Sequence, residues 1–218
     1  MKRVWINPWF VVPVLVFFLT AIVLAVITPY GEEILYLNPW REGWLNPFFR
    51  RVTHLGEAPA FVLAGVAAMF WRYRFTLVIA LVGLLTSPLV YTLKDQIAMD
   101  RPKTYFEKSG KIDSLVVVPD EQLNIGRTSF PSGHTTAAFA LYGVITLMLD
   151  PRARRWGLPL ALLAVMVGFS RIFLVQHFLR DVLGGAVLGL MLAWLGWQLA
   201  QIPYFQRQAW LDKSLPAK

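Results

Sequence analysis

Long apolar runs separated by short polar segments dominate the chain. Five of these runs approach the roughly 20 residues that an α-helix needs to cross a bilayer core of about 30 Å. They cover residues 10–27, 75–93, 130–149, 157–175 and 182–199. A sixth run, residues 59–71, is shorter, and we expect its helix to begin upstream, near Val52. The pattern therefore predicts an all-α, polytopic membrane protein whose core is a bundle of six transmembrane helices.

No internal repeat and no low-complexity linker interrupts the chain, so we expect residues 1–218 to form a single membrane-embedded domain. Lys2 and Arg3 precede the first apolar run, as basic residues do in a signal sequence. No small-residue cleavage site follows this run, and the run is long enough to span a bilayer. We therefore expect it to be retained as the first membrane helix.

The composition supports a membrane protein and narrows its chemistry. Hydrophobic residues make up 56% of the 218 residues and charged residues only 16%, which is typical of a chain with membrane spans. Because the chain has no cysteine, disulfides, thiolate nucleophiles and thiolate-bound metals are excluded. Only three histidines are present, His54, His134 and His177, so a multi-histidine metal site is not expected. We expect neither a metal nor another cofactor.

The net charge of +8 indicates the orientation in the membrane. Six spans place both termini on one side, and that side carries ten basic and two acidic residues, whereas the other side carries eleven of each. The ten basic residues are Lys2, Arg3, Arg72, Arg74, Arg152, Arg154, Arg155, Arg207, Lys213 and Lys218. The positive-inside rule then places the termini in the cytoplasm, at the cytoplasmic membrane. Tryptophans mark the same boundary, as belt residues do: Trp5, Trp9, Trp71, Trp156 and Trp197.

This charge distribution speaks against nucleic acid as a partner. The excess of basic residues lies in short loops between spans and in the tails, and no block rich in lysine and arginine with interleaved aromatic residues occurs. Membrane lipids are the expected surroundings.

Three polar motifs fall at span ends on the outward face. The first contains Lys94, Arg101 and Pro102. Lys94 and Arg101 are seven residues apart, so they would share a face if the helix continued. Pro102 disfavours helix at Arg101, however, so the helix should end there. The two cations can bind phosphate oxygens; the alternative is that they are long basic side chains that reach out of the membrane.

The second motif, Pro131-Ser132-Gly133-His134, opens a predicted helix. The free N–H groups and the positive dipole end of a helix favour an anion, and Gly133 lets a ligand approach the backbone closely. His134 in the first turn can protonate a leaving oxygen. The alternative is that Ser132 caps the helix and His134 is an interfacial polar residue.

The third motif contains Ser170 and Arg171, followed by His177 and Asp181. His177 and Asp181 stand four residues apart, as neighbours on one helical face do. A carboxylate on one imidazole nitrogen fixes the tautomer and leaves the lone pair of the other nitrogen free for attack. An ordinary surface His–Asp pair is the alternative. Arg171 lies six residues before His177, so a turn must intervene if both are to reach one phosphate.

Together, three cations and two histidines on one membrane face indicate phosphoryl transfer. The three motifs resemble the signature of the type 2 phosphatidic acid phosphatase superfamily over about residues 52–200, with no departure from the pattern. The resemblance implies a metal-independent phosphatase with a six-span core. It implies that His177 is the nucleophile and forms a phosphohistidine, that Asp181 orients it, and that His134 is the general acid. It also implies a phosphate site made of Lys94, Arg101, Arg171 and the backbone amides of Ser132 and Gly133.

The expected activity is hydrolysis of a lipid phosphate or pyrophosphate on the outer face of the cytoplasmic membrane. Substrates of the superfamily include phosphatidic acid, phosphatidylglycerophosphate, undecaprenyl pyrophosphate and lipid A. An alternative is a lipid phosphotransferase in which a lipid hydroxyl replaces water at the same site. A vanadate-dependent peroxidase is disfavoured because the site lies at a lipid boundary. A transporter is disfavoured because the charges cluster at one surface and do not line a pore.

Four further features lie outside the signature. Residues 30–57 suit a short amphipathic segment on the outer leaflet or a plain connecting loop. Residues 103–129 form a long outer loop, which is a candidate lid or headgroup-recognition segment. Gly185, Gly189 and Ala193 form a small-residue stripe, which suits packing within the bundle or, alternatively, homodimerisation. His54 and Glu57 lie near the outer surface and receive no role.

Overall fold

The computed structural model describes residues 7–215, and these form helices and connecting loops without a β-strand. Lys2, Arg3, Trp5 and Lys218, which contribute to the orientation argument, lie outside the described residues. The all-α prediction is confirmed.

Six helices match the six predicted segments. They are α1 (Pro8–Ile27), α4 (Ala58–Met69), α5 (Tyr73–Ile97), α7 (Gly133–Met148), α8 (Gly157–Phe173) and α9 (Leu179–Ala200). Four described segments, which contain α1, α5, α8 and α9, are long and apolar enough to cross a membrane, and a bent pair of helices brings the number to five. Helix α7 has 16 residues and is therefore about 24 Å long. Six spans remain a prediction.

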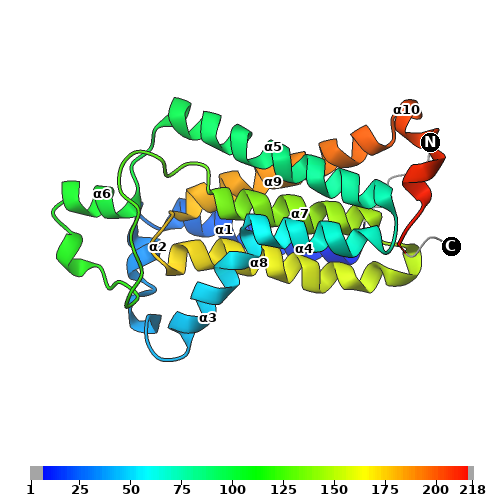
Figure 1. Cartoon of the computed structure of the whole chain (residues 1–218). Coiled ribbons are helices and arrows are strands. Elements are labelled where there is room, and N and C mark those ends of the chain that lie inside the picture. Colours follow the sequence, from blue (N-terminus) through cyan, green and yellow to red (C-terminus); the bar gives the residue numbers. More distant parts are fainter. Residues whose placement is uncertain (1–6, 216–218) are drawn as a thin grey trace.

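Shorter helices fill the connections (Figure 1). Between α1 and α4 lie α2 (Glu32–Leu35), η1 (Asn38–Trp40), α3 (Leu45–Val52) and η2 (Thr53–Gly56). Between α5 and α7 lie α6 (Pro102–Lys108) and η3 (Ile112–Ser114), so the long outer loop begins as a helix. At the opposite end of the bundle, η4 (Pro151–Trp156) precedes α8, and α10 (Pro203–Gln206) and η5 (Ala209–Asp212) follow α9.

The second predicted span is not one straight helix. Helical residues do lie upstream of Pro59, as expected, but the segment Leu45–Gly56 meets α4 at an angle of 58°. Glu57 at the break has an extended backbone, with φ −114° and ψ 171°. Pro59 in the first turn of α4 has no N–H to donate to a helix that continues from upstream, and its ring conflicts with the preceding turn. The sequence therefore begins a new helix at this point.

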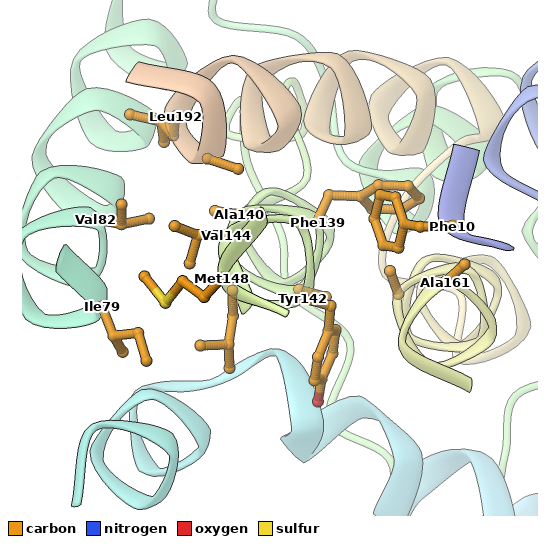
Figure 2. Packing of buried hydrophobic residues seen from close by; sticks show 14 of the residues in the cluster. Phe10, Ile79, Val82, Phe139, Ala140, Tyr142, Val144, Met148, Ala161 and Leu192 are labelled. Carbon is orange, nitrogen blue, oxygen red and sulfur yellow. The ribbon is translucent and has the colours of Figure 1, made fainter. Parts of the chain in front are cut away.

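Helix α7 lies in the middle of the bundle, where α5, α8 and α9 pack around it (Figure 1). Twelve of its 16 residues are buried. Figure 2 shows part of the resulting core, in which side chains of α7 meet residues from the surrounding helices. These partners include Phe10 of α1, Val82 of α5, Ala161 of α8 and Leu192 of α9.

The small-residue stripe of α9 packs directly on α7. A Cβ atom on Gly185 would lie 2.6 Å from the carbonyl oxygen of Ser132, and one on Gly189 would lie closer still to that of Thr136. Ala193 faces Gly143 in the same interface. The prediction that this stripe serves packing within the bundle is confirmed, because any larger side chain would separate the two backbones.

The outer surface of the bundle is apolar. Large hydrophobic side chains such as Leu19, Val26, Val62 and Leu84 are exposed on α1, α4 and α5, as expected for helices that contact lipid. The two ends of the described chain lie together at one end of the bundle, and α2, α3 and α6 lie at the other (Figure 1). The three signature motifs lie at the end that carries α2, α3 and α6.

Candidate active site

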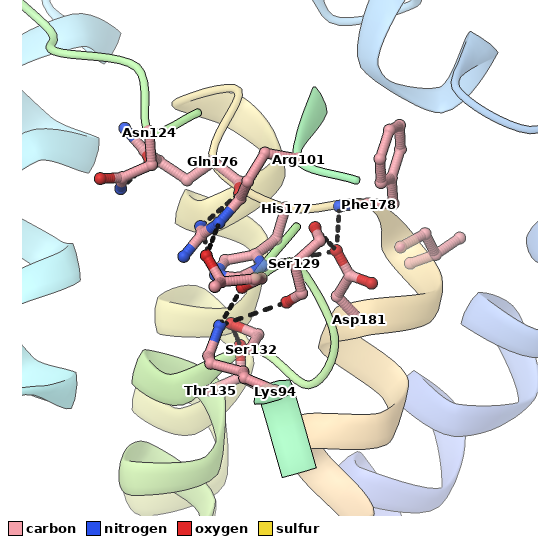
Figure 3. Close-up of polar contacts among 12 residues, drawn as sticks. Lys94, Arg101, Asn124, Ser129, Ser132, Thr135, Gln176, His177, Phe178 and Asp181 are labelled. Atoms are coloured by element: carbon pink, nitrogen blue, oxygen red, sulfur yellow. Dashed lines mark hydrogen bonds and ion pairs between the residues drawn. The ribbon is translucent and has the colours of Figure 1, made fainter. Parts of the chain in front are cut away.

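The three motifs come together at the end of the bundle that carries α3 and α6. Lys94 lies in the last turn of α5, His134 in the first turn of α7, and Arg171 in the last turn of α8. His177 lies in the turn between α8 and α9, and Asp181 lies in the first turn of α9 (Figure 3). The turn expected between Arg171 and His177 is present, with the amides of Gln176 and His177 both donating to the carbonyl oxygen of Arg171.

His177 and Asp181 form a pair, but not as neighbours on one helix. His177 precedes Phe178, which is the N-cap residue of α9, and Asp181 is the third residue of that helix. The Asp181 Oδ2 accepts hydrogen bonds from the Phe178 amide at 2.9 Å and from the Ser129 hydroxyl at 2.5 Å. It lies 3.3 Å from Nδ1 of His177. The two residues are therefore not neighbours on one helical face, as their spacing predicts, because His177 lies before the helix and the Asp181 carboxylate reaches it while capping the helix N-terminus.

Contacts on both nitrogens fix the tautomer of His177. Nη1 of Arg101 lies 3.2 Å from Nε2 of His177 and donates to the carbonyl oxygen of Gln176 at 2.9 Å. A guanidinium can only donate, so Nε2 must be the acceptor and Nδ1 must carry the proton that faces Asp181. The side chain is 2% exposed. This arrangement presents a neutral imidazole whose lone pair is on Nε2.

The surroundings keep that imidazole neutral. Burial lowers the pKa of His177 well below its ordinary value of 6.5, and the positive charges of Arg101, Arg171 and Lys94 lower it further. Each nearby cation disfavours a positive charge on the ring. A nucleophilic histidine must be unprotonated at the attacking nitrogen, and the same three cations that favour this state can also bind a phosphate.

The loop residues Thr128 and Ser129 hold two of the cations. Lys94 donates from Nζ to the carbonyl oxygen of Thr128 and, at 3.4 Å, to that of Ser129. Arg101 donates from Nε to the Thr128 hydroxyl at 3.3 Å. Because Ser129 also contacts Asp181 (Figure 3), this short segment positions both cations and the carboxylate.

Lys94 and Arg101 do not share a helical face. Helix α5 ends at Ile97, and Ala98 adopts the left-handed conformation with φ 49°. Arg101 is extended and precedes Pro102, which begins α6, as the proline predicts. Both side chains instead reach Thr128, Lys94 through the carbonyl oxygen and Arg101 through the hydroxyl. Arg101 is 9% exposed and contacts Thr128, Gln176 and His177. It is therefore not a basic side chain that reaches out of the membrane into solvent.

Arg171 is the most enclosed cation of the three. Its residue is 5% exposed, and its Nη1 donates to the hydroxyl of Thr53 at 2.6 Å. Its Nε is buried without a hydrogen-bond partner among the described residues. A buried cation with an unused donor is costly, and an anion bound beside it satisfies both the charge and the donor.

The N-terminus of α7 differs from the expectation in one respect. The amide of Ser132 donates to the backbone oxygen of Asp181 at 3.0 Å, so it is already used within the protein. The Ser132 side chain makes no cap hydrogen bond and accepts one from the Thr135 hydroxyl at 2.9 Å. The Gly133 amide makes no hydrogen bond within the described residues. The Gly133 amide and the Ser132 hydroxyl can therefore still donate to a phosphate.

His134 has a partner that the sequence did not indicate. Its Nε2 lies 3.0 Å from Oε1 of Glu57, and the same oxygen lies 3.0 Å from Nδ1 of His54. Glu57 stands in the break between η2 and α4. A carboxylate inside an otherwise apolar segment is a signal for a functional position, and it could have identified Glu57. The hydroxyl residues Thr53, Thr128 and Ser129 carry no such signal.

The long outer segment is tied to the site through Gln176. This residue is 2% exposed. It donates to the carbonyl oxygen of Gln122 and to Glu121, each at 2.9 Å, and accepts from Asn124 at 2.6 Å. Its own carbonyl oxygen accepts from Arg101 (Figure 3). The segment is thus attached to the residue before His177, and its role as a lid or headgroup-recognition element stays a prediction.

A large apolar groove begins at the polar site. It has a volume of about 1020 Å³ and runs between α4 and α5, with α7 as its floor. Glu57, Lys94, Gly133 and His134 line one part of it. The rest is mostly apolar and includes Phe61, Val66, Met69, Ala80, Leu84 and Val90. Among residues 7–215, no group of three or more His, Cys, Asp or Glu side chains is arranged to hold a metal ion.

The family model described as "PAP2 superfamily" matches residues 71–203. Phosphatidylglycerophosphatase B of Bacillus subtilis (strain 168) is 32% identical over 167 residues, which cover 71% of this chain and 75% of that protein.

Two crystal structures have similar folds. A transmembrane PAP2-type phosphatidylglycerolphosphate phosphatase from Bacillus subtilis superposes with a TM-score of 0.63 and 28% identity, covering 88% of this chain and 96% of that one. LpxE of Aquifex aeolicus superposes with a TM-score of 0.64 over 77% of this chain and 93% of that one. With 23% identity, it supports the fold alone.

Proposed function

This chain belongs to the PAP2 superfamily of phosphatases, and on that premise we propose that it hydrolyses a lipid phosphate or pyrophosphate monoester on the outer face of the cytoplasmic membrane. The observation that carries the proposal is the apolar groove that begins at Lys94 and His134. A phosphate site alone suits many soluble substrates, whereas a groove toward the lipid-facing surface suits a substrate with hydrocarbon chains.

The groove has the shape and the surroundings that a lipid needs. Val62, Leu84 and Tyr91 line it and are exposed on the outer surface of α4 and α5, so the groove opens toward the bilayer. A hydrocarbon chain can lie against its apolar wall while the phosphate remains at the polar end. The chains of a membrane lipid are already surrounded by hydrocarbon, so they can enter the groove without losing apolar burial, and the three cations can then bind the phosphate.

In the first step, Nε2 of His177 attacks phosphorus and the P–O bond to the lipid breaks. His134 gives its proton to the leaving oxygen, so the products are a phosphohistidine and a lipid alcohol, or a lipid monophosphate if the substrate is a pyrophosphate. Lys94, Arg101 and Arg171 neutralise the phosphoryl oxygens, which is the main requirement of phosphoryl transfer. Asp181 faces the Nδ1–H of His177, which keeps its proton, and the carboxylate stabilises the positive charge that the ring gains as the P–N bond forms.

In the second step, water attacks the phosphohistidine. His134, now neutral, takes a proton from that water, and the P–N bond breaks with its electron pair returning to Nε2. Inorganic phosphate leaves and both histidines regain their initial protonation states. A lipid hydroxyl in place of water would give the transferase reaction, and the products distinguish the two.

The relatives suggest which substrates to assay first. The Bacillus subtilis protein is named a phosphatidylglycerophosphatase, so phosphatidylglycerophosphate heads the panel, with phosphatidic acid, undecaprenyl pyrophosphate and lipid A beside it. Purified, chelator-treated protein should release inorganic phosphate from at least one of these lipids, and His177→Ala should release none. Absence of release from every lipid would overturn the proposal. Transfer of phosphate to a lipid alcohol without release would establish the transferase instead.

A further inference from the structure

Glu57 forms a contact with His134 that neither the motifs nor the mechanism above uses. Oε1 of Glu57 lies 3.0 Å from Nε2 of His134 and 3.0 Å from Nδ1 of His54. The three side chains come from η2, the break before α4, and the first turn of α7. Residues 57 and 134 are 77 positions apart in the sequence, so this contact is made by tertiary packing.

The backbone around Glu57 is locked against α7. A Cβ atom on Gly56 would lie 2.6 Å from the carbonyl oxygen of His134, so only glycine permits the two backbones to approach this closely. About two turns further along α7, the hydroxyl of Tyr142 donates to the carbonyl oxygen of Leu55 at 2.9 Å. These contacts fix the backbone next to Glu57 against α7, so that the Glu57 side chain starts from a fixed position beside the imidazole of His134.

Capping of helix α4 does not explain the presence of Glu57. It occupies the N-cap position of α4, yet its side chain makes no cap hydrogen bond. Its side chain is 34% exposed and that of His134 is 29% exposed, so the pair is partly shielded from solvent at the edge of the groove. A carboxylate at this depth is costly unless its partners compensate for the loss of water. Its hydrogen-bond partners are the two histidines.

We propose that Glu57 is a positioning residue for His134 in the reaction described above. The carboxylate accepts the Nε2–H of His134, and this leaves Nδ1 as the atom that gives its proton to the leaving oxygen. The negative charge also stabilises the protonated imidazole, which is the form a general acid needs. The inference rests on the proposed phosphatase function and adds a residue outside the three signature motifs.

His54 completes the arrangement from the solvent side. Its side chain is 65% exposed, and its Nδ1 donates to the same Oε1 atom that faces His134. A second donor on this oxygen limits rotation of the carboxylate and favours its ionised form. His54 thus supports Glu57 and has no contact with the phosphate-binding residues among the hydrogen bonds of residues 7–215.

The test exploits the dependence of acid catalysis on the leaving group. A lipid alkoxide needs a proton, whereas nitrophenolate needs little, so both rates are measured for each variant. For the lipid substrate we expect Glu57→Gln to lower kcat about 10-fold and Glu57→Ala about 100-fold, within the range that general acid catalysis contributes. Glutamine keeps the shape and an acceptor oxygen but loses the charge. For p-nitrophenyl phosphate, we expect both losses to be smaller than about 3-fold.

A double variant separates action through His134 from other effects. In the His134→Ala background, Glu57→Gln should cause no further loss, because the group it positions is absent. The control is Glu42→Gln, which removes an exposed carboxylate between η1 and α3 and should leave both rates unchanged. Thermal unfolding in detergent checks that each variant is folded.

Four outcomes would overturn the proposal. Equal losses with both leaving groups, or additive losses in the double variant, would show that Glu57 does not act through the general acid. Unfolding of Glu57→Gln under conditions where the wild type is folded would assign the residue to the fold. If the wild type released phosphate from neither class of substrate, the phosphatase function itself would fail. In every other case the phosphatase function stands whatever the result for Glu57.

Discussion

Nη1 of Arg101 lies 3.2 Å from Nε2 of His177, the nitrogen that we propose attacks phosphorus. This contact fixes the lone pair on Nε2 and places a permanent positive charge where phosphate oxygens must arrive. Phosphorus and Arg101 cannot both occupy the space in front of Nε2. When substrate binds, we expect Arg101 to release this nitrogen and to donate to the phosphate, so one residue keeps the nucleophile neutral before binding and stabilises charge afterwards.

The first prediction concerns the charge of Arg101. Its positive charge is one cause of the low pKa of His177, so Arg101→Gln should raise that pKa toward 6.5. In the wild type, His177 stays neutral as the pH falls through 6.5; in the variant, it should become protonated at higher pH. The acid limb of the pH profile of kcat/KM should therefore shift to higher pH. Turnover should also fall about 10²- to 10³-fold, because charge stabilisation by Arg101 is lost. ¹⁵N NMR titration of the histidines measures the shift, and an unchanged His177 pKa would contradict the electrostatic argument.

The second prediction separates the two histidines. His177→Ala should abolish any phosphoenzyme and leave essentially no turnover, because no other side chain replaces the attacking nitrogen. His134→Ala should lose most activity with a lipid alkoxide and recover part of it with nitrophenolate as the leaving group. Rapid-quench trapping of acid-labile phosphohistidine reports the intermediate. Its presence in His177→Ala together with its absence from His134→Ala would reverse the roles.

The third prediction concerns Asp181. Its Oδ2 accepts from Phe178 and Ser129 and faces Nδ1 of His177, so Asp181→Asn removes the charge that enforces the tautomer. We expect turnover to fall between the levels of the two histidine variants, by about 10²- to 10⁴-fold. Asp113→Asn, an exposed aspartate in η3, is the control and should retain wild-type turnover. Wild-type activity in Asp181→Asn would show that the tautomer needs no carboxylate.

The fourth prediction is that turnover needs no divalent metal. Lys94, Arg101 and Arg171 can supply the charge stabilisation that a metal ion supplies in other phosphatases. Phosphate release should be unchanged after dialysis against EDTA, and added Mg²⁺ or Zn²⁺ should not increase it. Loss of activity in EDTA with recovery on addition of metal would refute this prediction.

The fifth prediction is the side of the membrane on which the site lies. Because the chain has no native cysteine, single cysteines report topology without background. Ser109→Cys, next to α6, should react with a membrane-impermeant thiol reagent in intact cells or spheroplasts, whereas Arg152→Cys in η4 should not. Both positions are exposed in the protein. The opposite labelling pattern would invert the proposed orientation.

Local sequence was enough to predict the helical segments and the end of the bundle where the three motifs lie. Helix formation and membrane insertion depend on local composition, because a helix satisfies its backbone hydrogen bonds within one segment. The break before Pro102 and the packing stripe of Gly185 and Gly189 could also be predicted, because each depends on residue types at short spacing. The motif residues were all predicted at span ends on one face of the membrane, so they were expected to lie near one another. Figure 3 shows His177, Arg101 and Lys94 together.

The contacts that hold those residues in place depend on how the helices pack together. Asp181 reaches His177 from a helix N-terminus, Arg171 meets Thr53 at a separation of 118 residues, and Glu57 meets His134 at a separation of 77. Residue spacing encodes neighbours along one helix, whereas these contacts depend on where separate helices end relative to one another. That relation follows from side-chain packing, such as the fit of Gly56 against the backbone of α7, and local periodicity carries no record of it.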